Sequence, residues 1–394
     1  MNILHLVYDE KFIPFTIDLF SACKNSNNLF LVKVKDISSP LKYLNSSGNM
    51  RIIDKRYFRS SSMHDDLAWC DSLVVHYLDV FGAKIILSAP ERVNVLWSGW
   101  GGDYYELLPG GERNYWGDET KYLVTRMRKK ELCSISNLPR LASEAEFYLK
   151  KYIFDYPLIK AAIKRVDFFS APVPEDFYLL KSGLGANFRA SYIQLNYGSV
   201  EKTFLPGLEE IVDENILVGN SATETNNHMD VFRILYKMEL GERKIIVPLS
   251  YGADSYKNEI VHQGYKLFGS RFEPLLKFVP LDEYNTLIAS CSVVIMGHRR
   301  QQALGNICAM LYKGAKVFIN DESVIYRFFR ARDAHVFGLS NLTVYDYNIF
   351  TPLTESQKKK NREVIDNFWS DEVVRRNVGF FIDEVQKRKI LHVY

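Results

Sequence analysis

Two arginines lie in a polar loop whose residue types are suited to binding a diphosphate group. The loop, HRRQQALGN at 298–306, follows an apolar run at 292–297 and precedes a segment of helical composition, ICAMLYKGA. A helix N-terminus presents unpaired N–H groups to an anion, and arginine adds a fixed charge with a forked donor. A solvated polar loop is the alternative. We predict that Arg300 is catalytic through stabilising a leaving diphosphate, and that its neighbours contact the donor substrate: Arg299, Gln301, Gln302, Gly305 and Asn306.

A second polar loop, at 219–228, follows the apolar run at 214–220 and is rich in uncharged hydrogen-bonding side chains. Glycine permits a turn or a close approach to a ligand, while asparagine and serine suit sugar hydroxyls and phosphate oxygens. The loop lacks the G-x-G-x-x-G spacing of a dinucleotide site, and capping of the next helix is the alternative. After the next run, a tyrosine ring can pack against a base or a sugar, although a rim position is more frequent. The predicted donor contacts here are Gly219, Asn220, Ser221, Asn227, His228 and Tyr251.

In the first half of the chain, two carboxylates follow a strand candidate and three glycines. The segment WSGWGGDYYE covers 97–106, in which Asp103 and Glu106 lie among aromatic residues. A partly desolvated carboxylate can take a proton from an acceptor hydroxyl, so we predict that Asp103 or Glu106 is the general base. The same three-residue spacing fits a capping box, which is the alternative. We predict acceptor contacts at His76, Trp100 and Tyr104, although a histidine inside a strand is more often a core residue.

The chain lacks the short motifs that bind metal ions or nucleoside triphosphates. No P-loop, no C-x-x-C pair and no D-x-D pair occurs in the sequence. We therefore expect no metal and no cofactor, apart from a nucleotide sugar as the donor substrate. Without a metal, Arg299, Arg300 and the helix terminus must supply the positive charge that stabilises a leaving diphosphate.

Short apolar runs bounded by turn residues alternate with longer segments of helical period. This rhythm predicts parallel strands covered by helices, and therefore two doubly wound, Rossmann-like α/β domains that face a cleft. Ligands of such sheets collect at the carboxyl ends of the strands, where the three loops are expected. The predicted strands cover 3–8, 29–34, 72–78, 94–100, 214–220, 243–250, 276–280, 292–297 and 315–320.

The domain boundary is expected in a polar stretch that is punctuated by Gly198, Pro206 and Gly207. We predict an acceptor-binding domain at 1–205, which includes a helical insertion, and a donor-binding domain at 206–350. The remaining residues, 351–394, have helical composition and are expected to form a tail that crosses back to the first domain.

The composition excludes several classes of function. Of the 394 residues, 50 are basic and 47 are acidic, so the net charge of +3 is too small to indicate a nucleic-acid partner. Five scattered cysteines favour a reducing, cytoplasmic compartment. The N-terminal sequence has no apolar segment long enough for a signal peptide, and no run of about 18 apolar residues could span a bilayer.

Basic and aromatic residues lie together in two segments of the first half, at 126–131 and 147–165. A helix with lysine and arginine beside phenylalanine, tyrosine and leucine can lie on an anionic membrane surface. We therefore predict peripheral contact with a membrane; an amphipathic helix packed on its own domain is the alternative. Pro157 should divide the second segment into two helical pieces.

The order of these motifs resembles that of the TDP-N-acetylfucosamine:lipid II N-acetylfucosaminyltransferase family of enterobacterial common antigen synthesis. The resemblance implies a two-domain GT-B glycosyltransferase that moves a TDP-activated amino sugar to an undecaprenyl-diphosphate-linked oligosaccharide. It also implies a location on the cytoplasmic face of the inner membrane. The matching pieces, which spread over most of the chain, are Trp100 to Glu106, ILVGNS with Asn227 and His228, VPLSY at 247–251, and Arg300-Gln301-Gln302 with Gly305.

Other functions fit some of the same motifs. A related transferase of O-antigen or capsule assembly would use a different donor sugar. A non-catalytic protein that binds a nucleotide or a glycan would keep the two domains without turnover. A sugar-nucleotide epimerase is disfavoured, because the dinucleotide fingerprint is missing.

Overall fold

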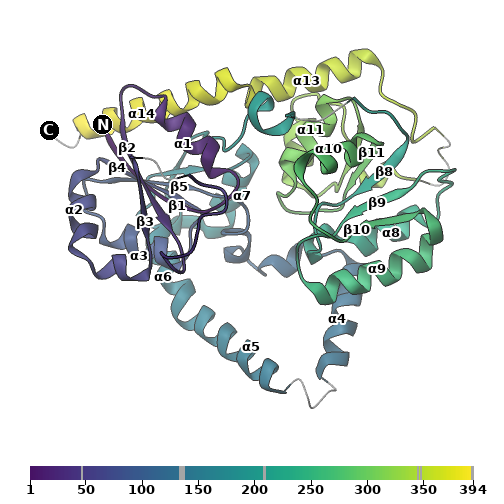
Figure 1. Ribbon diagram of the computed structural model, residues 1–394, viewed down its shortest axis with the longest axis horizontal. Helices are drawn as coiled ribbons and strands as arrows, with labels where there is room; N and C mark the ends of the chain where they lie inside the picture. Colours follow the sequence, from purple (N-terminus) through teal and green to yellow (C-terminus); the bar gives the residue numbers. More distant parts are fainter. Residues whose placement is uncertain (46–47, 133–137, 207–209, 344–345, 347, 392–394) are drawn as a thin grey trace. The chain divides into compact units, whose positions relative to one another are not determined.

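The computed structural model divides the chain into two compact units, each built from separate stretches of sequence. It describes residues 1–45, 48–132, 138–206, 210–343, 346 and 348–391. Unit 1 comprises Met1–Pro109, Ser143–Lys202 and Trp369–Tyr394, whereas unit 2 comprises Gly110–Ala142 and Thr203–Phe368. Each unit is a parallel sheet with helices on both faces, which confirms the predicted fold class of two doubly wound α/β domains (Figure 1).

Unit 1 contains a seven-stranded sheet in the order β3-β2-β1-β4-β5-β6-β7. Its central strands are continuous apolar runs because both faces of the sheet are covered, and β1 has five consecutive buried residues. Figure 1 shows α1 and α14 on one face and α2, α3 and α6 on the other. The strands are β1 (Asn2–Tyr8), β2 (Asn27–Lys33), β3 (Met50–Ile53), β4 (Ser72–His76), β5 (Asn94–Ser98), β6 (Phe168–Ser170) and β7 (Ser191–Tyr192).

The last helix of the chain, α14, completes the core of unit 1. Its residues Val374, Val378 and Phe381 pack in one apolar cluster with residues of β1, β2 and α1. The helices of this unit are α1 (Ile13–Ser21), α2 (Ser61–Trp69), α3 (Val80–Ser88), α6 (Tyr156–Ile163), α7 (Pro174–Leu184) and α14 (Asp371–Leu391).

The basic and aromatic segment predicted to break at Pro157 is helical on both sides of that residue. Helix α5 (Leu138–Lys150) continues through a π-helical turn at Lys151–Asp155 into α6, whose first turn contains Pro157. Proline has no N–H group to donate to the preceding turn and its ring crowds that turn, so the regular α-helical bonding is interrupted there. In place of the predicted break, the chain forms a π-helical turn at Lys151–Asp155 that joins α5 to α6.

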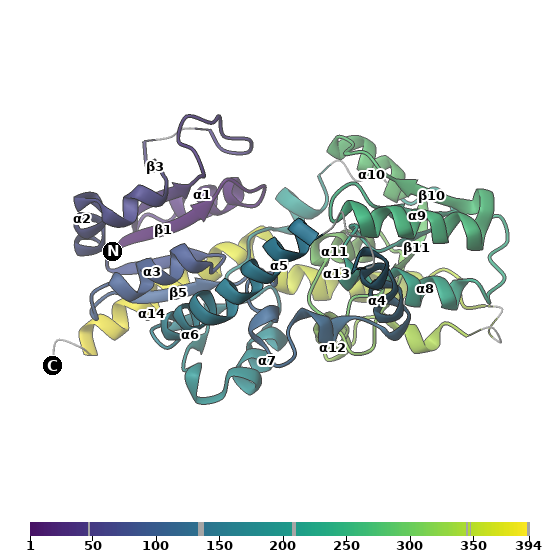
Figure 2. The ribbon, with the colours of Figure 1, turned by 90° about the horizontal axis from the view of Figure 1, so that it is seen from below.

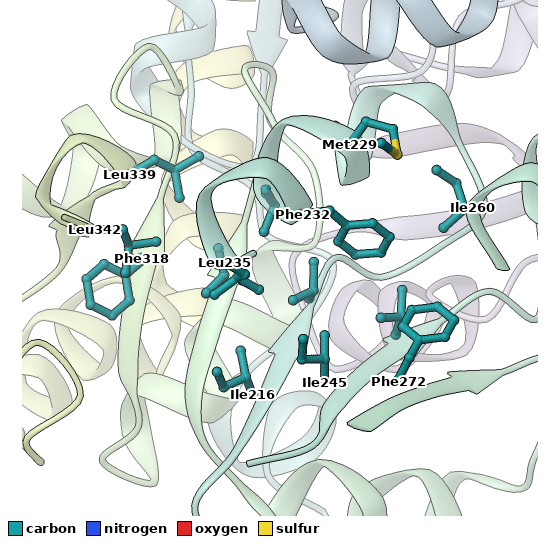
Figure 3. Close-up of a cluster of buried hydrophobic side chains, with 14 of the residues drawn as sticks. Ile216, Met229, Phe232, Leu235, Ile245, Ile260, Phe272, Phe318, Leu339 and Leu342 are labelled. Carbon is teal, nitrogen blue, oxygen red and sulfur yellow. The ribbon is translucent and has the colours of Figure 1, made fainter. Parts of the chain in front are cut away.

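Unit 2 contains a six-stranded sheet in the order β10-β9-β8-β11-β12-β13. Figure 3 shows part of its core, where Phe232 and Leu235 of α8 pack with Ile216 of β8 and Ile245 of β9. The strands are β8 (Asn215–Val218), β9 (Ile245–Pro248), β10 (Phe272–Leu275), β11 (Cys291–Met296), β12 (Lys316–Ile319) and β13 (Phe337–Gly338). The helices are α4 (Asp118–Leu132), α8 (His228–Leu235), α9 (Asp254–Phe268), α10 (Leu281–Ala289), α11 (Leu304–Tyr312), α12 (Val324–Arg330) and α13 (Glu355–Trp369).

Residues 110–142 belong to unit 2, whereas the sequence-based division placed them in the first domain. Trp116, Leu123 and Val124 are buried in the same apolar cluster as Phe232. Figure 2 shows α4 beside α8, and these two helices are in contact. The chain passes from unit 1 to unit 2 after Lys202, close to the expected boundary, while Gly207 lies outside the described residues.

Candidate active site

The two predicted donor loops meet at the point where the strand order of unit 2 reverses. This point lies between β8 and β11, because β9 follows β8 on one side and β12 follows β11 on the other. Loops that leave the carboxyl ends of such a pair run to opposite faces of the sheet, and ligands of open α/β sheets bind there. The loops at 219–227 and 297–303 are the two that leave this pair.

Two arginines lie in the loop between β11 and α11, as the sequence predicts. Nη2 of Arg300 lies 3.4 Å from Oε1 of Glu112, and the Arg300 side chain is only 13% exposed. Arg299 donates from Nη1 to the carbonyl of Trp116 at 3.4 Å and lies 3.7 Å from Glu322. Both guanidinium groups are therefore held in place by the protein, and the forked donors of arginine suit a phosphate-bearing ligand.

The N-terminus of α11 adds backbone donors beside these arginines. No side chain of the described residues caps this helix end, and the preceding Ala303 has a left-handed backbone with φ of 60°. Such a backbone is uncommon for a residue with a side chain and is often found at binding sites. Gly305 lies in the first turn, Asn306 donates to the Tyr284 hydroxyl at 2.8 Å, and Gln301 is buried.

Asn226 is the centre of a hydrogen-bond network that joins the two loops. Its Oδ1 accepts from the backbone N–H of Asn220 and from Nε2 of His298, each at 2.8 Å. Its Nδ2 donates to Oγ of Ser221 at 3.0 Å and to Oγ1 of Thr223 at 2.8 Å. Asn226 is fully buried and is absent from the site predicted by sequence. The network fixes the loop after β8 against the loop after β11.

Gln302 extends the same network toward the surface. Its Oε1 accepts from Oγ1 of Thr225 at 2.7 Å, and its Nε2 donates to Oδ1 of Asn220 at 3.1 Å. Asn220 in turn donates from Nδ2 to the hydroxyl of Tyr251, at 3.0 Å. The Tyr251 ring is 57% exposed, so it is available to a ligand. The amide groups of Asn220 and Gln302, by contrast, form hydrogen bonds with each other and with neighbouring side chains of the protein.

Asn227 links the same loop to the segment at 110–142. Its Oδ1 accepts from the N–H of Gly117 at 2.7 Å, and its Nδ2 donates to the carbonyls of Tyr115 at 3.0 Å and Gly297 at 2.8 Å. These bonds use both donors and one acceptor position of the amide. The structure therefore gives Asn227 an anchoring role in place of the predicted contact with a donor.

Two buried histidines lie at this edge of the sheet and are neutral. Burial lowers the pKa of His228 to about 3, and its Nδ1 lies 3.2 Å from the hydroxyl of Tyr256. Burial and the nearby charge of Arg300 hold the pKa of His298 well below 6.5. Gly219 has φ of 68°, and a Cβ atom there would lie 2.6 Å from Oδ1 of Asn226. The predicted residues Gly219 and His228 thus shape the loop from within the protein.

Asp103, one of the two predicted bases in unit 1, is buried and accepts three hydrogen bonds. Its Oδ2 accepts from Nε1 of Trp97 at 2.7 Å and from the N–H of Leu78 at 3.0 Å. Its Oδ1 accepts from the N–H of Trp100 at 2.8 Å. Burial raises the pKa of Asp103, while the three donors act in the opposite direction. The carboxylate is occupied by the protein and joins the loop after β4 to the loop after β5.

Glu106, the other predicted base, lies in a different environment. It is partly exposed, and its Oε1 lies 3.1 Å from Nζ of Lys151. A lysine at this distance favours the ionised carboxylate, which is the form that accepts a proton. Of the two predicted carboxylates, Glu106 is therefore the more exposed to solvent.

Two predicted acceptor contacts lie inside the protein. His76 is buried in β4, where its Nε2 lies 3.2 Å from Nδ1 of His5. Burial holds the pKa of His76 well below 6.5 and lowers that of His5 to about 3. Tyr104 is fully buried and stacks on Tyr105, with ring centroids 5.0 Å apart. Both positions belong to the core, so neither residue is placed to contact an acceptor.

Trp100, the third predicted acceptor contact, is partly exposed at the carboxyl end of β5. Its ring lies at 5.9 Å from that of Tyr77, 6.1 Å from that of Tyr197 and 6.2 Å from that of Phe12, measured between centroids. The edge of the unit 1 sheet thus carries a group of aromatic rings.

Within the described ranges, no group of three or more histidine, cysteine, aspartate or glutamate side chains is placed to hold a metal ion. No helix in the same part of the chain is both long enough and apolar enough to cross a bilayer.

A comparison with known families decides the class of the protein. Residues 192–343 match the family model described as 4-alpha-L-fucosyltransferase, glycosyl transferase group 56. The chain is a glycosyltransferase, and its residues 192–343 are similar to a fucosyltransferase family. The match confirms the resemblance found in the motifs, and the matched range contains both arginines and the Asn226 network.

Solved structures with the GT-B fold align with this glycosyltransferase over nearly its whole length. Sucrose-phosphate synthase from Thermosynechococcus elongatus has a TM-score of 0.63 at 10% identity, covering 98% of this chain and 100% of that chain. The lipopolysaccharide outer core galactosyltransferase WaaB in its apo form gives 0.60 at 9%, with 98% and 99% covered. HepE from Anabaena, in complex with UDP and glucose, gives 0.58 at 11%, with 98% and 100% covered. At such identities the likeness establishes the fold alone.

Proposed function

We propose that this glycosyltransferase moves an N-acetylfucosamine-like or other 4-amino-dideoxy sugar from TDP to an undecaprenyl-diphosphate-linked oligosaccharide. In this scheme unit 2 binds the donor, unit 1 binds the acceptor, and the product enters a bacterial surface polysaccharide. The observation that carries the proposal is the pair Arg299 and Arg300 at the uncapped start of α11, inside the range that matches the family. HepE was solved with UDP and glucose and alpha-glucosyltransferase with UDP, which supports a nucleotide-sugar donor.

The proposed chemistry assigns one charged group to each side of the bond that breaks. The acceptor hydroxyl attacks the anomeric carbon of the donor sugar, and the bond from that carbon to the diphosphate oxygen breaks. Arg300 and the N–H groups of α11 stabilise the negative charge that develops on the diphosphate. Glu106 takes the proton of the attacking hydroxyl. The exposed ring of Tyr251 packs on the base or the sugar of the donor.

Nucleotide binding tests the donor half of the proposal. Thermal unfolding is followed with TDP, UDP or GDP at equal concentration, since a ligand that binds the folded state raises the melting temperature. We expect the largest rise with TDP and a much smaller rise for Arg300→Ala. A larger rise with UDP or GDP would favour an O-antigen or capsule transferase with a different donor. No rise with any of the three would contradict the proposed donor site.

An exposed apolar surface on α5 and the following turn supports peripheral contact with a membrane. Within 147–165 there are five basic residues and one acidic residue. Aromatic and aliphatic groups enter the headgroup boundary of a bilayer, while lysine and arginine attract anionic lipid. We therefore propose attachment to the cytoplasmic face of the inner membrane. The exposed apolar side chains are Phe147, Tyr148, Leu149, Tyr152, Ile153 and Phe154.

Co-sedimentation with vesicles tests this attachment. We expect the protein to sediment with vesicles of phosphatidylglycerol and phosphatidylcholine, and to remain in solution with phosphatidylcholine alone. The double variant Ile153→Asp and Phe154→Asp should lose sedimentation, because two carboxylates replace the apolar contact. Tyr178→Asp is the matched control, since Tyr178 is equally exposed on α7 of the same unit. Equal sedimentation of the double variant and the wild type would contradict attachment through this surface.

A further inference from the structure

Four aromatic rings from four separate segments meet at the carboxyl edge of the unit 1 sheet. Phe12 precedes α1, Tyr77 follows β4, Trp100 follows β5, and Tyr197 follows β7. We term these four residues the Trp100 cluster, because the Trp100 ring lies within 6.2 Å of each of the others. The strand order of unit 1 reverses between β1 and β4, so the segments that carry Phe12 and Tyr77 leave its switch point.

The Trp100 cluster differs from the aromatic core that lies beneath it. Trp97, Tyr104 and Phe169 are fully buried, whereas all four rings of the cluster are partly exposed. Ring faces that stay accessible at the ligand-binding edge of a sheet are suited to the apolar CH face of a sugar. The indole Nε1 of Trp100 is buried and has no hydrogen-bond partner among the described residues.

The backbone at Tyr77 is held in a costly conformation that brings its ring to Trp100. Tyr77 has φ of 70°, which is rare for a bulky residue and is found mainly where a binding site requires it. Its ring packs against Gly102, where an added Cβ atom would lie 3.5 Å from the ring edge.

Asp103 fixes both loops that carry these rings. Its Oδ2 accepts from the N–H of Leu78, directly after Tyr77, and its Oδ1 accepts from the N–H of Trp100 itself. We infer that the Trp100 cluster is a platform for a carbohydrate ring of the acceptor, and that Asp103 is the positioning residue that holds it. The inference deepens the proposed function, on which it rests, by naming the acceptor surface and giving Asp103 a role other than that of the base.

The hydrogen bonds of Asp103 predict how an amide would behave in its place. All three partners are N–H donors, and they approach both carboxylate oxygens. In Asp103→Asn one oxygen becomes an NH₂ group, which sets donor against donor at one or two of these contacts. The variant should therefore disturb Tyr77 and Trp100. If Asp103 were instead the general base, the same variant would lose turnover and keep sugar binding.

Saturation-transfer difference NMR on the full chain tests the platform with four probes, the methyl glycosides of N-acetylglucosamine, glucose, galactose and mannose. We expect the wild-type protein to saturate the ring CH protons of at least one probe. Trp100→Ala should weaken the affinity for that probe about tenfold, which corresponds to about 1.4 kcal/mol. Tyr178→Ala removes a more exposed aromatic ring from α7 of the same unit and should leave the affinity unchanged.

The variants of Asp103 and Trp100 give outcomes that are distinct from a failure of the proposed donor site. Asp103→Asn should weaken binding of the same probe and raise the KM for an acceptor more than it lowers kcat. Unchanged probe binding by this variant would overturn its positioning role. If the wild-type protein transferred no saturation to any of the four sugar probes, the Trp100 cluster would not be a carbohydrate platform. Equal transfer by Trp100→Ala and the wild type would lead to the same conclusion. The TDP-dependent rise in melting temperature is measured on the same samples, so loss of the donor site is seen separately.

Discussion

The carboxyl edges of the two sheets share a topology and differ in chemistry. In unit 1 the edge carries four partly exposed aromatic rings, whose loops are joined through the single carboxylate of Asp103. In unit 2 the corresponding edge carries amides and hydroxyls that are joined through Asn226, together with two arginines. Each edge thus has one buried polar side chain as its centre. The residues around that centre suit a sugar face in unit 1 and a diphosphate in unit 2.

This difference shows which level of structure decides function in such a protein. Both sheets are parallel, both reverse strand order near the middle, and both place loops at the same edge. The topology therefore supplies a location without specifying a ligand. The loop residues decide the ligand, and the two centres hold those residues in place.

Removing the charge from the unit 2 edge should produce the largest effect. Arg300→Ala should reduce turnover about 10³-fold, as expected when a donor to developing negative charge is lost. The melting temperature should change less than turnover does, because the Glu112 side chain, which loses an ion pair, is 42% exposed. Steady-state transfer assays and thermal unfolding measure the two quantities.

Arg233 supplies a matched control in the same unit. It forms an ion pair with Glu119 at 3.3 Å, and both side chains are largely exposed. Arg233→Ala should keep wild-type turnover, since a surface ion pair of this kind contributes about 0–1 kcal/mol. If Arg300→Ala retained half of the wild-type turnover, the arginine would have no part in stabilising the leaving group.

Removing the proton acceptor from the unit 1 edge should have the next largest effect. Glu106→Gln keeps the size of the side chain but cannot take a proton, so transfer should fall about 10²-fold. The acid limb of the profile of kcat/KM against pH should disappear in this variant. Glu91→Gln changes an exposed carboxylate near the amino end of β5 and serves as the control. An unchanged acid limb in Glu106→Gln would assign the base to another residue.

Most strands whose two faces are covered could be predicted from the sequence, although the short buried strand β6, Phe168–Ser170, could not. β1, β4 and β11 are continuous apolar runs, and the sequence places each of them within two residues at either end. β10 was predicted at 276–280 but lies at Phe272–Leu275. This strand has one neighbour and contains a glutamate and a proline, while the more apolar residues after it, Leu276 and Phe278, are exposed. An edge strand gives a weak pattern because only part of it is buried.

The position of the arginine loop followed from the sequence, whereas the centre of the network did not. A strand, a polar loop and a helical segment are local patterns, so the site of Arg299 and Arg300 could be located. Asn226 could not be distinguished from its neighbour Asn227, because its partner His298 lies 72 residues later. The assignment of 110–142 to unit 2 depends in the same way on the packing of Trp116, Leu123 and Val124.

Buried histidines at both edges should make the protein sensitive to acid. Burial lowers the pKa of His5 and His228 from 6.5 to about 3, and it holds the pKa of His76 and that of His298 well below 6.5. The unfolded chain therefore binds more protons than the folded one between about pH 3 and 6.5, so stability falls as the pH falls through this range. Each histidine contributes up to about 1.4 kcal/mol per pH unit.

Replacing one histidine at a time shows how much each sheet edge contributes to the dependence of melting temperature on pH. His5→Gln in unit 1 and His228→Gln in unit 2 should each reduce the fall of melting temperature between pH 7 and pH 5. His262→Gln, at an exposed position on α9, is the control and should leave the dependence on pH unchanged. If neither of the first two variants flattened the dependence, other groups would account for acid unfolding.

A pair of glycines separates the effect of backbone strain from that of the contact with Asn226 at the unit 2 edge. Gly219 and Gly269 both have left-handed backbones, with φ of 68° and 57°. A Cβ atom at Gly269 meets nothing within 4 Å, whereas at Gly219 it would lie 2.6 Å from Oδ1 of Asn226. Gly269→Ala should therefore lower the free energy of unfolding by about 1 kcal/mol through strain alone. Gly219→Ala should add about 1–3 kcal/mol, because it displaces the amide that Asn220 and His298 require.

The pair also tests whether the Asn226 network serves binding as well as folding. Gly219→Ala moves the loop after β8, so it should reduce the TDP-dependent rise in melting temperature, whereas Gly269→Ala should preserve it. Chemical unfolding and the nucleotide titration together compare the two variants. Equal losses of stability in the two variants would mean that Asn226 adapts to the added methyl group without strain. If Gly219→Ala kept the TDP-dependent rise in melting temperature, the Asn226 network would not be required for nucleotide binding. Binding would then depend on Tyr251, the two arginines and the N-terminus of α11.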